Sequence, residues 1–286
     1  MTEKPLLVTM EGDTATIVLN RPEVRNALSI ELSDMLVDAI QKIKRSTDIK
    51  FVVIKGAGGT FCAGDDIKEM IRWGDDEYGN STQGANGVMR RVRIYQDMAN
   101  ALEELDKLTI SAVDGMAVGG GLEITMACDF VIATQRARWG MPEVDSGITP
   151  GWGGTTRLCR YIGKRRTKQI NIIGALMPAW RAVDWGLWNR VVADDRLDEE
   201  VEALLKVLRS KNQQACRQLK YIINRGSETD LYTAQGFEML SAGLSGAVNG
   251  FWEVCDADRG SGVRDFASKG SIWQTRRALA KDFWAD

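Results

Sequence analysis

Residues 114–129 read DGMAVGGGLEITMACD and are the most informative stretch of the sequence. Gly119, Gly120 and Gly121 follow a short apolar segment and open a segment with helical spacing. Consecutive glycines let the backbone approach a ligand closely. A helix that begins at these glycines directs its free N–H groups and the positive end of its dipole toward such a ligand. The pattern predicts either a site for a developing oxyanion or a tight strand-to-helix turn that binds nothing.

One glutamate lies within this stretch, and a second follows it. Glu123 falls in the first turn of the predicted helix, and Glu143 follows in WGMPE. Two carboxyl groups divide acid and base roles when their surroundings separate their pKa values. Taken singly, Glu123 is better explained as a partner of the helix dipole, and Glu143 is equally well explained as a surface carboxylate.

On both sides of this stretch, alternating strand and helix signals predict an α/β fold with mostly parallel strands. Apolar runs predict strands at 14–19, 51–54, 110–113 and 130–133. Helical spacing predicts a helix over 30–45 with Ser29 as its N-cap, and another from Val92 to Leu105. Residues 73–88 are rich in Gly, Asn and Asp, and we expect a mobile loop beside a site there.

The strand signals stop at about residue 195. Helices are predicted at 197–209, 212–224 and about 230–254, and Trp273, Phe283 and Trp284 would anchor the tail. We therefore expect two regions: a core over 1–195 that binds and transforms a ligand, and a helical region over 196–286 that serves as a lid or an assembly surface.

Composition narrows the chemistry. The chain has 286 residues, of which 44% are hydrophobic and 27% charged, and its net charge is −2. This balance does not favour binding to nucleic acid or to a membrane surface. There is no histidine, and the five cysteines form no C-x-x-C pair, so the sequence predicts no histidine-based triad and no zinc site. Without a long apolar run, we expect a soluble cytoplasmic protein.

Two further glycine-rich segments follow predicted strands. The first, GAGG at 56–59, differs from a dinucleotide loop because Phe61 stands where the third glycine belongs, and it leads into FCAGDDI. The second, GITPGWGGT at 147–155, predicts either a loop whose backbone holds a water molecule or a simple turn.

Five segments in this order resemble the enoyl-CoA hydratase/isomerase (crotonase) superfamily, in particular its hydratase-like branch. They are NRPEVRNAL (20–28), FCAGDDIKEM (61–70), GMAVGGGLEITMACD (115–129), MPEVDSGITPGWGGTTRL (141–158) and AVDWGLWNRVV (182–192). The resemblance implies a spiral core of repeated ββα turns, a helical C-terminal trimerisation region and acyl-CoA thioester substrates.

The resemblance also implies roles for individual residues. The backbone N–H groups of Asp65 and Gly120 would hold the thioester oxygen, while Glu123 and Glu143 would act as the acid–base pair. The side chain of Asp65 would either bring a charge to the pocket or point away. Gly151 would help to place the water molecule. The positions expected to contact substrate or CoA are Val24, Arg25, Ala63, Asp66, Ile67, Gly119, Pro142 and Gly151.

Some of these expectations have competing explanations. Arg25 either meets a phosphate or lies on the surface. Aromatic and apolar side chains would line an acyl pocket, although most tryptophans are expected in the core or at subunit contacts. The pocket candidates are Trp73, Tyr78, Met89, Trp139 and Trp152.

The predicted function is reversible addition of water across the C2=C3 bond of a 2-enoyl-CoA. An isomerase, for which Asp145 is a candidate, or a hydratase–lyase acting on an aromatic acyl-CoA is the alternative. A non-catalytic CoA- or RNA-binding scaffold is the alternative of another class. We expect no cofactor other than the coenzyme A of the substrate, no metal, no nucleic acid or membrane partner, and a homotrimer or homohexamer.

Overall fold

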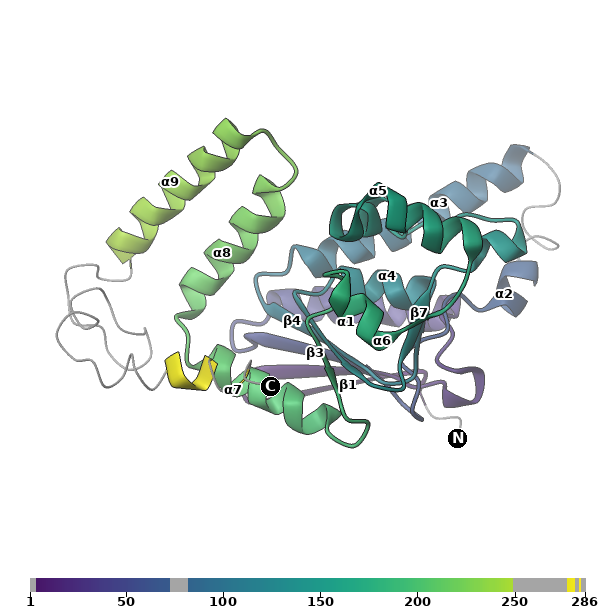
Figure 1. Ribbon diagram of the computed structural model, residues 1–286, viewed down its shortest axis with the longest axis horizontal. Coiled ribbons are helices and arrows are strands. Elements are labelled where there is room, and N and C mark those ends of the chain that lie inside the picture. Colours follow the sequence, from purple (N-terminus) through teal and green to yellow (C-terminus); the bar gives the residue numbers. More distant parts are fainter. Residues whose placement is uncertain (1–3, 73–81, 249–276, 281–282, 284–286) are drawn as a thin grey trace. The chain divides into compact units, whose positions relative to one another are not determined.

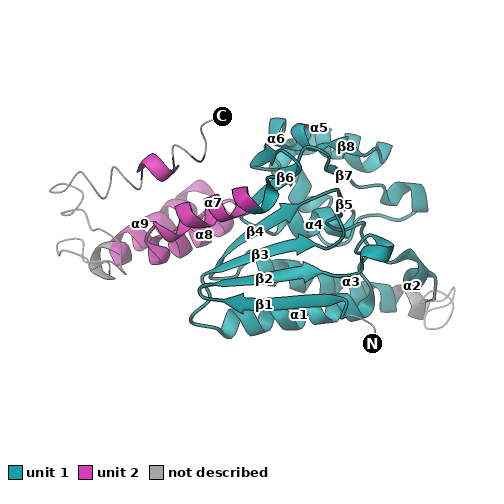
Figure 2. Ribbon diagram, turned by 90° about the horizontal axis from the view of Figure 1, so that it is seen from below, with its two compact units in different colours: residues 1–198 teal, residues 199–286 magenta. Residues whose placement is uncertain are grey.

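The computed structural model describes residues 4–72, 82–248, 277–280 and 283 (Figure 1). The chain divides into two compact units, residues 1–198 and 199–286, shown in different colours in Figure 2. Trp273 and Trp284, two of the predicted tail anchors, lie outside the described residues. The lid and assembly roles expected for the C-terminal region stay predictions.

The larger sheet of the first unit has six strands in the order β1-β2-β3-β4-β6-β9. Strands β1 (Leu6–Glu11) and β2 (Thr14–Leu19) form an antiparallel hairpin. The strands that follow, β3 (Phe51–Gly56), β4 (Leu108–Val113), β6 (Phe130–Thr134) and β9 (Arg190–Val192), all pair in parallel. All six residues of β4 are buried, as expected for a central parallel strand covered on both faces.

A second, three-stranded sheet contains β5 (Met116–Val118), β7 (Arg138–Gly140) and β8 (Met177–Pro178). Strand β4 leads into β5, and β6 leads into β7. After β3, Cys62 forms an isolated parallel bridge with Ala117 of β5. Three successive strands of the large sheet are thus each followed by a short segment on the second sheet. This repetition confirms the ββα spiral, and with it the α/β class.

Helices cover these sheets. In the first unit they are α1 (Ile30–Arg45), α2 (Ile67–Arg72), α3 (Thr82–Glu103), α4 (Gly120–Met126), α5 (Thr156–Ile173) and α6 (Ala179–Asp184), with the short 3-10 helices η1 (Pro22–Val24) and η3 (Glu143–Ser146). Helix α7 (Leu197–Arg209) crosses the boundary between the units. The second unit contains α8 (Gln213–Gly226) and α9 (Leu231–Val248).

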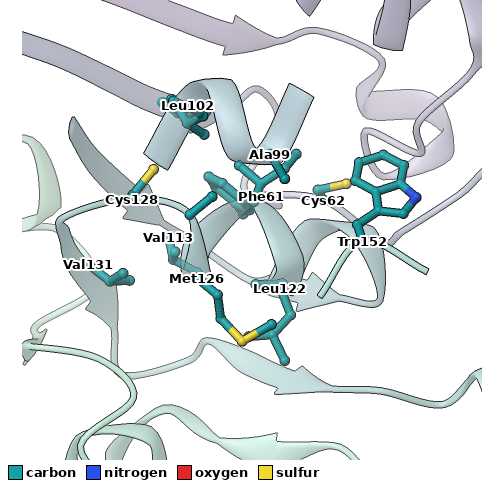
Figure 3. Packing of buried hydrophobic residues seen from close by; sticks show 14 of the residues in the cluster. Phe61, Cys62, Ala99, Leu102, Val113, Leu122, Met126, Cys128, Val131 and Trp152 are labelled. Carbon is teal, nitrogen blue, oxygen red and sulfur yellow. The ribbon is translucent and has the colours of Figure 1, made fainter. Parts of the chain in front are cut away.

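The core of the first unit surrounds α4, every residue of which is buried. Leu122 and Met126 of this helix belong to one cluster of buried side chains with Phe61, Val113 and Leu102 (Figure 3). Cys62 and Cys128 belong to the same cluster, and burial raises the pKa of the Cys62 thiol to about 12. These two cysteines therefore behave as small apolar residues.

The expectation of a loop over 73–88 is wrong for its second half, because α3 begins at Thr82. Residues 73–81 lie outside the described residues. Gly84, Asn86 and Gly87 are weak helix formers, so local propensity concealed this first turn and a half of α3. Further along α3, Tyr95, Met98, Ala99 and Leu102 are buried. The tertiary packing of this apolar face stabilises a helix that its N-terminal residues would not form alone.

Ser29 caps α1 as predicted, since its hydroxyl accepts a hydrogen bond of 3.1 Å from the N–H of Leu32. The Ser29→Ala variant is expected to lower the free energy of unfolding by about 1 kcal/mol. Urea denaturation measures this change. Ser46→Ala serves as the control, because the Ser46 hydroxyl at the other end of α1 makes only a 3.4 Å contact with the N–H of Ile49. An equal fall in the free energy of unfolding in the two variants would mean that the Ser29 hydrogen bond does not stabilise α1 as an N-cap.

Candidate active site

The glycine turn before α4 brings two distant segments of backbone together. Gly119 has a φ of 53°, a conformation that favours glycine. A Cβ on Gly121 would lie 2.5 Å from the carbonyl oxygen of Cys62, which leaves no room for a side chain. A Cβ on Gly64 would lie 3.6 Å from the amide nitrogen of Gly120. The loop at 61–65 and the start of α4 can pack this closely only because both carry glycine.

This packing leaves the backbone N–H groups of Asp65 and Gly120 available. Around Asp65, the N–H of Leu28 donates to the carbonyl of Gly64 at 2.8 Å, and the N–H of Asp66 donates to the carbonyl of Leu28 at 3.1 Å. The N–H of Asp65 itself makes no hydrogen bond to the described residues. Gly120 is the first residue of α4, where an N–H has no partner within the helix. The structure thus brings both predicted donors to one place.

Glu123 lies in the first turn of α4 and is 2% exposed. Its Oε1 accepts hydrogen bonds of 2.7 Å from the N–H groups of both Trp152 and Gly154. Its Oε2 makes no hydrogen bond to the described residues. Burial raises the pKa of Glu123 to about 8, although the two N–H donors act in the opposite direction. The nearby Glu143 and Asp65 contribute to this rise, so the three carboxyl groups lie close together.

Glu143 is the first residue of η3 and reaches the same glycine turn. Its Oε1 lies 3.0 Å from the place where Gly119 would carry a Cβ. Its Oε2 is buried and has no hydrogen-bond partner among the described residues. Burial raises the pKa of this carboxyl group as well. The two glutamates, twenty positions apart in the sequence, therefore converge beside the paired N–H groups.

The side chain of Asp65 also enters the site, which resolves the alternative that the sequence left open. Its Oδ1 lies 3.7 Å from the place where Gly120 would carry a Cβ. This oxygen is buried and lacks a hydrogen-bond partner among the described residues. Burial, and then the charge of Glu143, raises the pKa of Asp65 to about 7. The site therefore contains a third carboxyl group. The predicted role of Asp65 uses only its backbone N–H and gives no role to this carboxyl group.

The loop after η3 positions Glu123 in a way that sequence reasoning missed. The groups that hold Glu123 are backbone N–H groups of Trp152 and Gly154 and carry no side-chain signature. The predicted water-placing residue, Gly151, instead accepts a 2.8 Å hydrogen bond on its carbonyl from the side chain of Gln96 in α3. The Trp152 ring stacks on Tyr95 with ring centroids 4.3 Å apart. These contacts fix the loop against α3, and a water-placing role for Gly151 stays a prediction.

A cavity of about 740 Å³ opens between α3 and this loop. Gly151 and Trp152 line it, together with Val88, Val92 and Gln96. It therefore borders the segment that holds Glu123.

Five of the residues predicted to contact substrate or CoA lie in or next to η1 and the loop at 61–65; they are Val24, Arg25, Ala63, Asp66 and Ile67. The N–H of Ala63 donates to the carbonyl of Arg25 at 3.0 Å, which places these two segments side by side. Val24 is half-buried, Arg25 is exposed, and Ile67 is 63% exposed. Asp66 forms an ion pair with Arg21 at 2.9 Å, so its charge is already compensated. Contact of these residues with CoA stays a prediction.

The five residues that the sequence suggested for an acyl pocket do not all lie in one place in the described part of the structure. Trp139 lies in the core, fully buried, and its indole N–H donates to the carbonyl of Pro178 at 3.1 Å. Met89 is 60% exposed, and Trp73 and Tyr78 lie outside the described residues. Of the five, only Trp152 is seen next to the site, with a ring atom 3.6 Å from where Gly120 would carry a Cβ.

Within the described ranges, no three His, Cys, Asp or Glu side chains are grouped so that they could hold a metal ion. The same part of the chain contains no helix that is long and apolar enough to cross a membrane.

The raised pKa of Glu123 predicts how stability changes with pH. The folded protein keeps this proton until about pH 8, whereas the ordinary pKa of 4.5 applies to the unfolded chain. Between these values the unfolded state loses the proton first, so the free energy of unfolding falls as pH rises. The Glu123→Gln variant removes this contribution, which is worth up to about 4 kcal/mol.

Urea denaturation at about pH 5 and about pH 8.5 measures this effect. The variant is expected to lose less stability over this interval than the wild type does. The exposed Glu31→Gln, in the first turn of α1, is the matched control. The same pH dependence in Glu123→Gln and the wild type would contradict the raised pKa.

The sequence also matches known proteins. Residues 9–242 match the family described as enoyl-CoA hydratase/isomerase. The short-chain-enoyl-CoA hydratase of Clostridium acetobutylicum is 36% identical, over 83% of this chain and 88% of the relative. The crotonyl-CoA hydratase of Syntrophomonas wolfei is 35% identical, over 85% of this chain and 90% of the relative.

Solved structures show the same similarity. That of an enoyl-CoA hydratase from Bacillus anthracis superimposes with a TM-score of 0.80 at 30% identity, and the match covers 93% of this chain and 96% of that one. The family match spans most of the residues that form the spiral and all three carboxyl groups of the site. The chain therefore belongs to the enoyl-CoA hydratase/isomerase family.

Proposed function

We propose that this protein is an enoyl-CoA hydratase, which adds water reversibly across the C2=C3 bond of a 2-enoyl-CoA. The observation that carries the proposal is the convergence of Glu123 and Glu143 beside the free N–H groups of Asp65 and Gly120. Hydration needs one group to accept a proton from water and another to give a proton to carbon. Two carboxyl groups on one bound substrate can supply both.

In this mechanism the thioester oxygen lies between the two backbone N–H groups. Negative charge grows on this oxygen as water attacks C3, so fixed donors stabilise the transition state more than the substrate. One such donor contributes roughly 3–4 kcal/mol. The donors polarise the thioester by themselves, so a metal ion has no required part in the proposal.

Glu123 accepts the proton from the attacking water, and Glu143 gives the proton to C2. The two N–H groups that hold Oε1 of Glu123 orient the carboxyl group and leave Oε2 for the water. In the free protein, burial raises the pKa of both carboxyl groups, and the charge of Glu143 adds to the rise at Glu123.

For the CoA moiety, we propose binding at η1 and the loop at 61–65. Arg25 is exposed and forms no ion pair with the described residues, whereas Asp66 is neutralised by Arg21. A phosphate of CoA would therefore meet a basic side chain there.

We also propose that the protein assembles into a trimer or hexamer through its helical C-terminal region. Helices α8 and α9 expose many large apolar side chains, and burying such surface between subunits is favourable. A monomeric mass in solution would contradict this assembly. The exposed residues are Leu219, Tyr221, Ile223, Leu231, Tyr232, Met239, Leu240 and Leu244.

A panel of substrates tests the reaction. The protein is incubated with crotonyl-CoA, longer 2-enoyl-CoA esters and cinnamoyl-type CoA esters, and the loss of enoyl absorbance is followed. Hydration of any of these supports the proposal. A shift of the double bond without uptake of water would instead identify an isomerase. Binding of CoA esters without turnover would identify a non-catalytic scaffold.

A further inference from the structure

The hydration mechanism uses two carboxyl groups, but the site contains three. Asp65 contributes its N–H to the thioester oxygen in the proposed mechanism, and its carboxyl group has no assigned part. Yet Oδ1 of Asp65 is buried and unpartnered among the described residues. A buried polar atom without a hydrogen bond lowers the stability of the folded protein by about 1–3 kcal/mol. In an active site, such an atom indicates a position where a ligand forms the missing hydrogen bond.

No basic side chain in the described part of the chain is among the groups that influence the ionisation of Asp65. Lys68, the nearest basic residue in the sequence, is exposed. Arg21 is paired with Asp66 at 2.9 Å, and Arg91 is paired with Asp34 at 3.4 Å. The carboxyl group of Asp65 is therefore not one half of an internal ion pair.

The surroundings of Asp65 are otherwise apolar and aromatic on one side. Leu28 pairs with Asp65 in a parallel bridge, and its side chain reaches to 2.8 Å from where Gly120 would carry a Cβ. Burial first, and the charge of Asp65 among other causes, raises the pKa of Tyr95, so this ring is also near. Ligand pockets of this kind obtain their specificity from a few polar groups in an apolar wall.

We propose that the carboxyl group of Asp65 binds a hydroxyl group on the acyl chain, close to the reacting double bond, so that hydroxylated 2-enoyl-CoA esters are the preferred substrates. The inference rests on the proposed function, because it takes the thioester oxygen to be held by the N–H of Asp65 itself. With that oxygen in place, the side chain of the same residue can reach only the first few carbons of the acyl group.

A hydroxyl group suits Asp65 better than a group that only donates or only accepts hydrogen bonds. The pKa of Asp65 is raised to about 7, so both its protonated and its ionised forms are populated near neutral pH. The protonated form donates a hydrogen bond, and the ionised form accepts one. A hydroxyl group can form a hydrogen bond with either form, because it both donates and accepts.

Matched pairs of substrates test this preference. The pairs are but-2-enoyl-CoA with 4-hydroxybut-2-enoyl-CoA, and pent-2-enoyl-CoA with 5-hydroxypent-2-enoyl-CoA, all trans. For the wild type, kcat/KM is expected to be at least about tenfold higher for a hydroxylated ester than for its partner in one of the pairs. Asp65→Ala should bring this ratio to about one or lower, whereas Asp65→Asn should retain a preference because an amide also donates and accepts.

Asp38→Ala, which removes an exposed aspartate on α1, is the control and should leave the ratio unchanged. Equal kcat/KM values within both pairs in the wild type, or an unchanged preference in Asp65→Ala, would overturn the inference. If none of the four esters is hydrated, the proposed function fails instead. Dissociation constants for the same unconsumed esters then test the inference directly: similar values within each pair would overturn it, and tighter binding of a hydroxylated ester that is lost in Asp65→Ala would support it.

Discussion

Replacing Glu123 with Gln is expected to lower kcat for enoyl-CoA hydration by about 10²–10⁴-fold, the range that general acid–base catalysis contributes. The variant keeps the size of the side chain. The N–H groups of Trp152 and Gly154 both donate to Oε1, so the Gln side chain must place its carbonyl oxygen there. Its NH₂ group then faces the position of the water and cannot accept a proton. Binding of the CoA ester, measured as a dissociation constant, should change little.

Glu143→Gln should lower kcat within the same range, because the same reaction needs the second carboxyl group. The matched control is Glu31→Gln, which alters a glutamate in the first turn of another helix, far from the site in sequence and exposed. It should leave kcat unchanged. Near-normal rates in both Glu123→Gln and Glu143→Gln would remove the acid–base assignment altogether.

Replacing Gly64 with Ala is expected to lower kcat by about 10²–10³-fold, which is the usual effect of losing one oxyanion donor. Backbone donors cannot be deleted by substitution, but they can be displaced. The added methyl group would lie 3.1 Å from the carbonyl oxygen of Val118 and 3.6 Å from the amide nitrogen of Gly120. The φ of Gly64 is 95°, so the new residue is also strained. Either effect moves the N–H of Asp65, the next residue, away from that of Gly120.

Gly12→Ala separates this local effect from general strain. Gly12 lies between β1 and β2 with a φ of 57°, and no other atom lies within 4 Å of the place where its Cβ would be. Both variants should lose stability, but only Gly64→Ala should lose kcat while remaining folded. A folded Gly64→Ala variant with normal kcat would show that these N–H groups do not hold the thioester oxygen.

Local sequence signals predicted most of the first unit. Helix α1 could be assigned because its apolar positions repeat at helical spacing and Ser29 caps it. The buried strands could be assigned because each is a short apolar run ended by glycine or a polar residue. The N-terminal turns of α3 could not be predicted in this way, since Gly84 and Gly87 disfavour a helix. Trp139 was misplaced because a tryptophan in a pocket wall and one in the core have the same local sequence.

The site could be predicted only in part, for a related reason. The pairing of Glu123 with Glu143 came from resemblance to a family, since no spacing rule brings residues of two different helices together. The direction of the Asp65 side chain depends on the bridge between Leu28 and Asp65, a contact between segments far apart in the chain. The donors from Trp152 and Gly154 are backbone groups, and every residue except proline has one. The sequence identifies these groups but does not show where the tertiary structure places them.

In the proposed complex, both glutamates face one side of a bound thioester whose oxygen lies between two backbone N–H groups. A crystal structure with a bound 3-hydroxyacyl-CoA tests this arrangement. We expect the thioester oxygen at about 2.7–3.1 Å from the amide nitrogens of both Asp65 and Gly120. We also expect the carboxyl groups of Glu123 and Glu143 next to C3 and C2. A thioester bound elsewhere, or either carboxyl group turned toward bulk solvent in the complex, would contradict this arrangement.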